Sequence, residues 1–145
     1  MIDRELEELL NSLNVRYHKH PFTDGVNYEI AVRTGIHLQL DLDLYVDQLD
    51  VNFNGCYTLS EVAAYEWRFR RNPQAFDQWR TACLSSVRDI MTSDLRVETK
   101  WLFDSLLGGY LYRWNGQQWE CCGGGGSLFL FIGMRRVSEY RSWLA

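Results

Sequence analysis

Residues 38–54 read Leu-Gln-Leu-Asp-Leu-Asp-Leu-Tyr-Val-Asp-Gln-Leu-Asp-Val-Asn-Phe-Asn. Apolar and polar side chains alternate strictly in 38–44 and again in 49–54, which is the period of a β-strand with one buried face. A tight turn near Asp47-Gln48 would join the two strands and place the leucines, Val51 and Phe53 on the buried side. The carboxylates and amides then lie on the solvated side. The stretch therefore predicts an antiparallel hairpin with an acidic outer face.

The end of this stretch and the residues that follow it also fit the calcium-binding loop of an EF-hand. Such a loop needs oxygen ligands at positions 1, 3, 5 and 12, glycine at position 6 and a backbone carbonyl from position 7. Residues 50–61 meet these requirements, and apolar residues at helical spacing on both sides make 38–69 resemble an EF-hand, although no second loop occurs in the sequence. The resemblance implies calcium as a cofactor. Its ligands would be Asp50, Asn52, Asn54, Cys56 and Glu61.

The hairpin interpretation explains the same residues without an ion. Asp50, Asn52 and Asn54 become the solvated edge of a strand that ends at Gly55. Glu61 then belongs to Thr58-Leu59-Ser60-Glu61, a capping box at the start of a helix. We therefore expect no cofactor and keep a calcium-binding module as the alternative.

Helical and strand patterns alternate along the rest of the chain. Asp3 can cap an N-terminal helix, and Asn72-Pro73 starts a central helix whose apolar stripe includes Trp79. Strands are expected at 15–22, 28–34, 95–103, 110–119 and 128–132, with Asn115-Gly116 as a hairpin turn, while 134–145 fits either strand or helix. The predicted fold is α+β. It is a single domain over residues 1–145, in which both helices pack on one face of an antiparallel sheet of roughly five to eight strands.

Residues 123–127, Gly-Gly-Gly-Gly-Ser, have the sequence of a flexible linker. Glycine-rich segments behave as flexible coils, so we expect a mobile loop here. A natural hairpin loop, a loop replacement and a join all remain open as its origin. It does not match a phosphate-binding loop, because no Gly-Lys-Ser/Thr follows.

Composition and charge narrow the class of function. A chain of 145 residues with 46% hydrophobic residues is typical of one globular domain. A net charge of −4 and a pI near 5.3 argue against a nucleic-acid partner. No apolar segment approaches a membrane span and the N-terminus is acidic, so we expect neither a membrane partner nor a signal peptide. With the four cysteines read as reduced thiols, the expected location is cytoplasmic.

Candidate catalytic residues are few. His18 and His20 lie on one face of the strand expected at 15–22, a spacing that suits a metal or a pair of general bases. Solvated strand histidines are the simpler explanation. Cys121-Cys122 lack the Cys-x2-Cys spacing of a zinc site, and no Ser or Cys has a recognisable nucleophile motif around it. We expect no enzymatic activity, with an enzyme of dispersed site as an alternative.

An outward row of aspartates and an aromatic-rich hairpin over 110–119 are the remaining distinctive features. In size, acidity and element order, the chain resembles small bacterial immunity proteins that bind and neutralise toxin domains, and phage inhibitors of host defence have the same character. The resemblance implies a non-enzymatic inhibitor whose carboxylates occupy the basic groove of a protein partner, while aromatic side chains set the dissociation rate. The expected partner-binding residues are Asp41, Asp43, Asp47, Asp50, Tyr112, Trp114 and Trp119.

Overall fold

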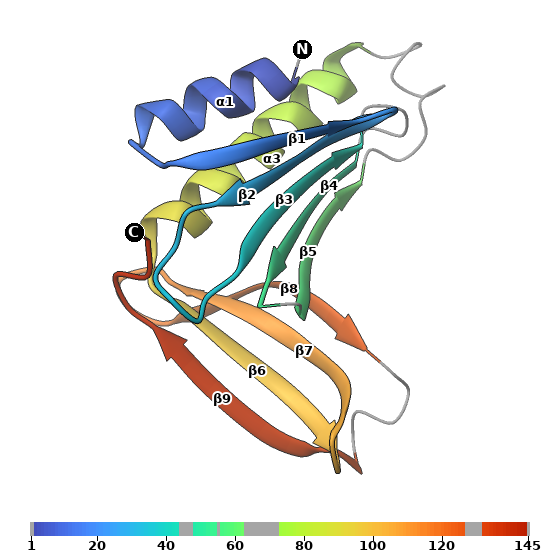
Figure 1. Cartoon of the computed structure of the whole chain (residues 1–145), viewed down its shortest axis with the longest axis vertical. Coiled ribbons are helices and arrows are strands. Elements are labelled where there is room, and N and C mark those ends of the chain that lie inside the picture. The colour runs from blue at the N-terminus through green and yellow to red at the C-terminus, as the bar shows by residue number, and fades with distance from the viewer. Residues whose placement is uncertain (1, 44–47, 55, 63–72, 127–131, 145) are drawn as a thin grey trace.

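The computed structural model describes residues 2–43, 48–54, 56–62, 73–126 and 132–144. The fold is α+β with antiparallel strands, as predicted, but the strands are divided between two sheets (Figure 1). The first sheet has five strands in chain order: β1 (Tyr17–Phe22), β2 (Gly25–Ile30), β3 (Leu38–Asp43), β4 (Gln48–Phe53) and β5 (Cys56–Val62). The second has four strands in the order β8-β7-β6-β9: β6 (Leu95–Leu102), β7 (Ser105–Trp114), β8 (Trp119–Gly126) and β9 (Met134–Tyr140).

The five-stranded sheet has the alternation that residues 38–54 predict. β3 and β4 pair so that Leu40 lies opposite Val51 and Leu42 lies opposite Leu49. These four side chains are buried, as is Tyr28 at the matching position of β2. The register thus keeps the apolar side chains of three strands on one face. Of the turn expected near Asp47-Gln48, Asp47 lies outside the described residues and Gln48 is the first residue of β4.

Two helices cover the apolar face of this sheet, α1 (Ile2–Ser12) and α3 (Pro73–Thr92) (Figure 1). Their buried side chains, among them Leu6, Leu10 and Trp79, belong to the same core cluster as the leucines of β3. Polar contacts also tie α1 to the sheet; in one of them, the Tyr28 hydroxyl donates to Glu7 Oε1 at 3.0 Å. The burial of Trp79 confirms the helical stripe that the sequence predicts.

The second sheet joins this core at one end and extends away from it at the other (Figure 1). At the junction, the ring of Phe53 contacts those of Tyr140 and Trp143, with centroids 5.0 and 5.7 Å apart. Trp143 is buried, and its Nε1 donates to the carbonyl of Ser93 at 2.9 Å. Residues 134–140, which fit both strand and helix in the sequence, form β9 because they pair with β6.

The prediction of a mobile loop at 123–127 is wrong for residues 123–126. They belong to β8 and pair with residues 108–111 of β7. Glycine faces glycine there, so the two backbones approach closely: a Cβ on Gly124 would lie 2.2 Å from the carbonyl oxygen of Gly109. Linker-like composition predicts flexibility only for a segment with no partner. Ser127 lies outside the described residues.

Long-range strand pairing also overrides other predictions that were based on local sequence. Residues 58–61, predicted as a helix cap, lie within β5, which pairs with β4. The strand expected at 28–34 begins at Gly25 and ends at Ile30. Of the strand expected at 128–132, only Ile132 is among the described residues, and it lies outside the strands. No helix of the described chain is both long and apolar enough to cross a membrane.

Candidate functional site

The side of β1 to β4 that faces away from the helices is mostly polar, and we call it the outer face. Its positions on β2, β3 and β4 alternate with the buried ones, so the register of the ladders aligns them across the sheet. Among the described outward positions of β1 to β4 there is no lysine or arginine. Lys19 lies at an inward position of β1, opposite Tyr28, where it forms an ion pair with Glu7 of α1. The outer face carries Asn27 and Glu29 from β2, Gln39, Asp41 and Asp43 from β3, and Gln48, Asp50 and Asn52 from β4.

Two carboxylates lie directly opposite each other at the centre of this face. Asp41 pairs with Asp50 in the β3–β4 ladder, and both residues are half-buried. Asn27 Nδ2 donates to Asp41 Oδ1 at 2.5 Å, and Gln48 Nε2 donates to the two carboxylate oxygens of Asp50 at 3.0 and 2.8 Å. A side-chain amide carries no net charge. These bonds therefore orient the two carboxylates, and the amides that make them add no positive charge.

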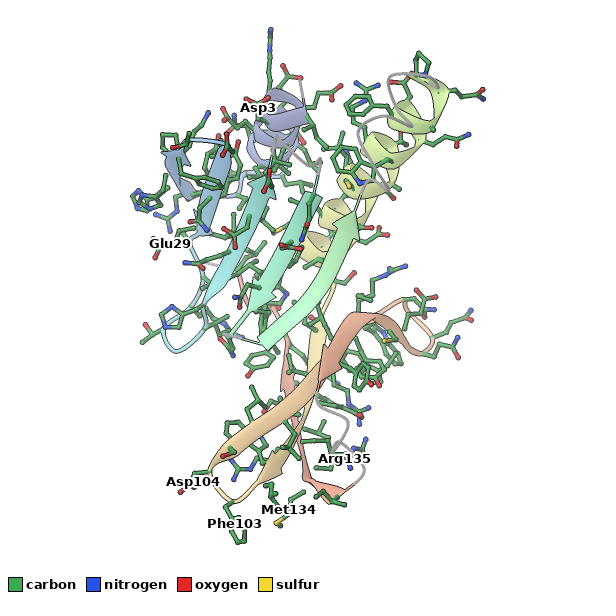
Figure 2. All side chains as sticks on the ribbon, turned by 90° about the vertical axis from the view of Figure 1, so that its right-hand side faces the viewer. Asp3, Glu29, Phe103, Asp104, Met134 and Arg135 are labelled. Atoms are coloured by element: carbon green, nitrogen blue, oxygen red, sulfur yellow. The ribbon has the colours of Figure 1, made fainter. Side chains whose placement is uncertain are left out.

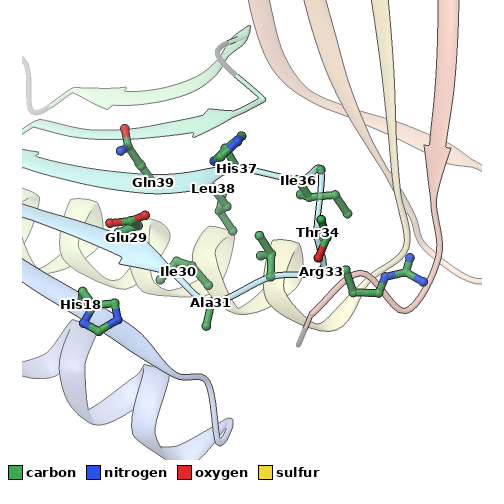
Figure 3. Close-up of a pocket in the computed structure, with 12 residues that line it drawn as sticks. His18, Glu29, Ile30, Ala31, Arg33, Thr34, Ile36, His37, Leu38 and Gln39 are labelled. Carbon is green, nitrogen blue, oxygen red and sulfur yellow. The ribbon is translucent and has the colours of Figure 1, made fainter.

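A shallow pocket of about 500 Å³ lies at the end of the outer face next to the loop between β2 and β3 (Figure 3). Its polar lining includes His18, Glu29, His37 and Gln39. His20 lies on the same side of β1 as His18, as predicted, with its Nε2 3.5 Å from Glu29 Oε2. These side chains extend the outer face with further hydrogen-bonding groups. The described residues contain no group of three or more His, Cys, Asp or Glu side chains that could hold a metal ion.

The EF-hand residues lie along a hairpin. Asp50 and Asn52 belong to β4, while Cys56 and Glu61 belong to β5, where Cys56 pairs with Phe53 and Glu61 with Leu49. Asn54 lies between the strands at a positive φ of 54°. The sequence resemblance requires an entering helix over 38–49, but β3 and β4 occupy the described part of that range. The described chain thus lacks the helix–loop–helix of an EF-hand at this place, and whether it binds calcium stays a prediction.

The side chain of Asn54 has structural partners of its own. Its Oδ1 accepts from the His37 amide at 2.8 Å, and its Nδ2 donates to the Tyr140 hydroxyl at 2.9 Å. These bonds tie the end of β4 to the loop before β3 and to the end of β9. Asn54 therefore links the two sheets in place of the ion ligation that the EF-hand template implies.

The aromatic hairpin predicted at 110–119 is confirmed and lies in the second sheet. Trp114 pairs with Trp119 across β7 and β8, and their rings meet edge to face with centroids 5.4 Å apart. Asn115 organises the turn between them, because its Oδ1 accepts from the amides of Gln117 and Gln118, both at 2.8 Å. The Arg96 guanidinium also lies over the Trp119 ring, 5.8 Å from its centroid.

Internal contacts occupy much of the aromatic surface. Trp114 is 38% exposed, whereas Tyr112 and Trp119 are half-buried, and burial raises the pKa of Tyr112. Asp41, Asp43 and Asp50 lie together on the outer face of the other sheet, and Asp47 lies outside the described residues. β5, which is an edge strand of the five-stranded sheet, contacts both β7 and β8. The structure therefore unites the described aspartates but places the aromatic residues on a different sheet.

Sequence reasoning missed Asn27 and Glu29 as members of this surface. Both alternate with the buried Val26, Tyr28 and Ile30, so the period was present in the sequence. Their place beside the aspartates depends on the β2–β3 register, which sets Asn27 opposite Asp41 and Glu29 opposite Gln39. A strand period alone does not define that register.

The described cysteines are consistent with a reduced protein. Cys83 is buried, Cys122 is half-buried and Cys121 is exposed, and each carries a thiol. Burial raises the pKa of the Cys122 thiol to about 11, against the opposing effect of the nearby Arg113 charge. A thiol with a raised pKa is a poor nucleophile near neutral pH. The side chain of Cys56 lies outside the described part of the chain.

Comparisons with models of known protein families, with curated proteins and with solved structures found no match to this chain.

Proposed function

We propose that this protein is a non-enzymatic binding protein that inhibits or neutralises a protein partner with a basic surface. The main support for this proposal is the outer face, to which three strands contribute Glu29, Asp41, Asp43 and Asp50. The described outward positions of β1 to β4 hold no lysine or arginine. Two of these carboxylates face each other across β3 and β4. Carboxylates gathered on one face make a local negative field, which attracts the lysine and arginine side chains of a basic partner.

The mechanism is electrostatic masking by a rigid surface. The aspartates are attached to paired strands, and the amides of Asn27 and Gln48 hold two of them in orientation. A carboxylate fixed in this way can accept two parallel hydrogen bonds from an arginine with little loss of side-chain freedom. The negative field would also accelerate encounter with a basic partner, in a way that salt weakens.

The aromatic hairpin has a secondary part in this proposal. Trp114 keeps an exposed edge, but Trp119 is held between Trp114 and the guanidinium of Arg96. We therefore assign recognition to the outer face. Trp114 is an additional contact only for a partner large enough to extend past β5.

The test compares two double variants that lose the same amount of charge. Asp41→Asn/Asp43→Asn removes two carboxylates from the outer face. Glu8→Gln/Asp77→Asn removes two from the helix side, where both groups are exposed and paired with arginines. Asp41 and Asp43 are half-buried, but asparagine keeps their shape and an oxygen that can accept from Asn27, and surface substitutions usually change stability by about 0.5 kcal/mol or less, so both proteins should remain folded.

The partner is first captured from the native host, and its association is then measured at several salt concentrations between about 0.05 and 0.5 M. The outer-face variant should associate several-fold more slowly and with a weaker salt dependence, because surface charges act mainly on the association rate. The helix-side variant should behave as the wild type does. Equal rates and equal salt dependence for all three proteins would reject the outer face as the binding surface.

A further inference from the structure

The far end of the second sheet carries exposed apolar side chains, and we call it the apolar tip. Phe103 is 88% exposed and Met134 is 76% exposed, and Leu102, Leu106 and Ile132 are also exposed. Figure 2 shows Phe103, Asp104 and Met134 together at the end of the molecule opposite the five-stranded sheet. The ladders bring the strand ends together, since Trp101 pairs with both Leu106 and Met134. Clustered exposed apolar side chains mark an interaction site.

The backbone at Phe103 is a second, independent indication of function. Its φ is +54°, in the left-handed region that glycine or asparagine adopts with least strain. A large aromatic side chain at this position is unfavourable both for the backbone and for its own hydration. Residues kept in such conformations cluster at functional sites.

Cationic side chains lie just behind the apolar tip, and we call Lys100, Arg135 and Arg136 the basic belt. Lys100 lies directly opposite Arg135 in the β6–β9 ladder, so like charges are adjacent. Arg135 forms an ion pair with Glu98, and the Arg136 guanidinium lies 4.7 Å from the centroid of the Trp101 ring. Ion pairing with one carboxylate leaves excess positive charge at this level of the sheet. The belt therefore favours an anionic binding surface.

The spacing of these two layers fits the boundary of a lipid bilayer. A strand rises about 3.3 Å per residue, so Lys100 lies roughly 10 Å behind Phe103. Structures that lie in the membrane interface bury their apolar side chains about 5–10 Å deep. When Phe103 is inserted to that depth, Lys100 and Arg135 reach the level of the lipid headgroups, and Trp101 and Met134, which pair with each other, lie one residue deeper at the interface. Cations and tryptophan are favoured at that level.

The shape of the tip argues against a protein occupant. A specific protein interface involves about 20–30 residues on each partner, whereas the described apolar tip consists of five exposed apolar residues. The tip is also the projecting end of the molecule (Figure 2), so a protein partner would need a cavity to receive it, and a second copy of this chain would present another projecting end. A bilayer needs no complementary cavity.

We infer that the apolar tip docks this protein reversibly on an anionic lipid surface. This goes beyond the proposed binding function, because the tip and the outer face lie at different ends of the molecule and can be occupied together (Figure 2). The sequence expectation of no membrane partner depends on the absence of a spanning segment. Peripheral docking by strand ends requires no such segment.

The test measures binding to phosphatidylcholine vesicles with and without about one third phosphatidylserine. The wild type should bind the anionic vesicles clearly more tightly than the neutral ones. Phe103→Asn should weaken binding about tenfold or more, because a buried aromatic side chain is lost. It should nevertheless melt at the same or a higher temperature, since asparagine tolerates the positive φ. Phe22→Ser is the matched control, because Phe22 is 51% exposed on another hairpin.

Charge variants complete the experiment. Lys100→Gln and Arg136→Gln should each weaken binding to anionic vesicles about fivefold, since one cation near such a surface contributes about a fivefold factor. Asp104→Asn should tighten it, because Asp104 is the acidic residue at the apex of the tip. These results are independent of the outer-face variants, so this inference and the proposed function can fail separately.

Three results would overturn the inference. The first is a folded wild type that binds neither vesicle at millimolar lipid. The second is vesicle binding that Phe103→Asn and Phe22→Ser change equally. The third is a dimer in light scattering that Phe103→Asn converts to monomer while no vesicle binding is seen, because the tip would then be a self-association surface.

Discussion

Gly124→Ala should destabilise the protein strongly, although the change adds only one methyl group. Gly124 has a φ of +147°, a region that is essentially restricted to glycine and costs other residues about 1–3 kcal/mol. The added Cβ would lie 2.2 Å from the Gly109 carbonyl oxygen and 2.7 Å from the Tyr110 Cα. Both are backbone atoms, so β8 must move away from β7, which adds about 1–3 kcal/mol for overpacking. We expect a loss of roughly 3 kcal/mol or more in total.

Gly125→Ala is the matched control for this prediction. A Cβ at Gly125 meets nothing within 4 Å, and glycine-to-alanine changes at compatible positions stabilise by about 0.4–1 kcal/mol. Urea unfolding followed by circular dichroism should place Gly125→Ala at or above the wild type and Gly124→Ala well below it. In a thermal scan, 3 kcal/mol corresponds to a decrease of roughly 10 °C. Equal and small effects of both substitutions would mean that 123–126 is a loop, and the pairing of β8 with β7 would be wrong.

Two further predictions concern calcium binding by residues 50–61 and the pH dependence of stability. Calorimetry should detect no calcium site in the micromolar range, because residues 50–61 lie along a hairpin; a saturable isotherm that Glu61→Gln removes would contradict the β4–β5 pairing. Burial is the larger cause and the hydrogen bond to Glu7 the next that raise the pKa of Tyr28 above its ordinary value near 10. The contribution of Tyr28 to stability is therefore complete below about pH 10. It is lost as the pH rises toward the pKa of the folded state. Tyr28→Phe should therefore lower the free energy of unfolding by about 1 kcal/mol at pH 7. Measured by urea unfolding above pH 10, the variant should lose stability less steeply with pH than the wild type does. Equal losses in the variant and the wild type would rule out Tyr28 as the titrating group.

The sequence predicts the parts of the fold that depend on local period. Apolar and polar residues alternate so regularly in 38–43 and 49–53 that only one arrangement buries the leucines there, and in the structure Leu38, Leu40, Leu42 and Leu49 are buried together. The outward position of Asp41, Asp43 and Asp50 follows from the same alternation. The stripe of α3 around Trp79 is likewise a local pattern of helical spacing.

Pairing between distant residues could not be predicted from a single sequence. The division into two sheets depends on contacts such as Val97 with Ser138, which no local pattern encodes. The glycines of 123–126 form a strand because β7 also presents glycine, at Gly108 and Gly109. Composition alone contains no information about that partner.

The outer face and the apolar tip likewise contain residues that a single sequence could not bring together. Glu29 was missed because its place beside the aspartates requires the β2–β3 register. The apolar tip was missed because its members come from separate segments, with Leu102 and Phe103 in one hairpin and Met134 at the start of β9. Each of these residues is unremarkable within its own stretch of sequence.

The packing of Trp143 against Phe53 has a consequence for the order in which the protein can fold during synthesis. The ribosome produces the leucine-rich face of the first sheet early, but it adds α3 later and Trp143 later still. At about 5–20 residues per second, that face waits several seconds for the side chains that complete its cover. We therefore expect slower translation of residues 63–143 to increase aggregation of the nascent chain.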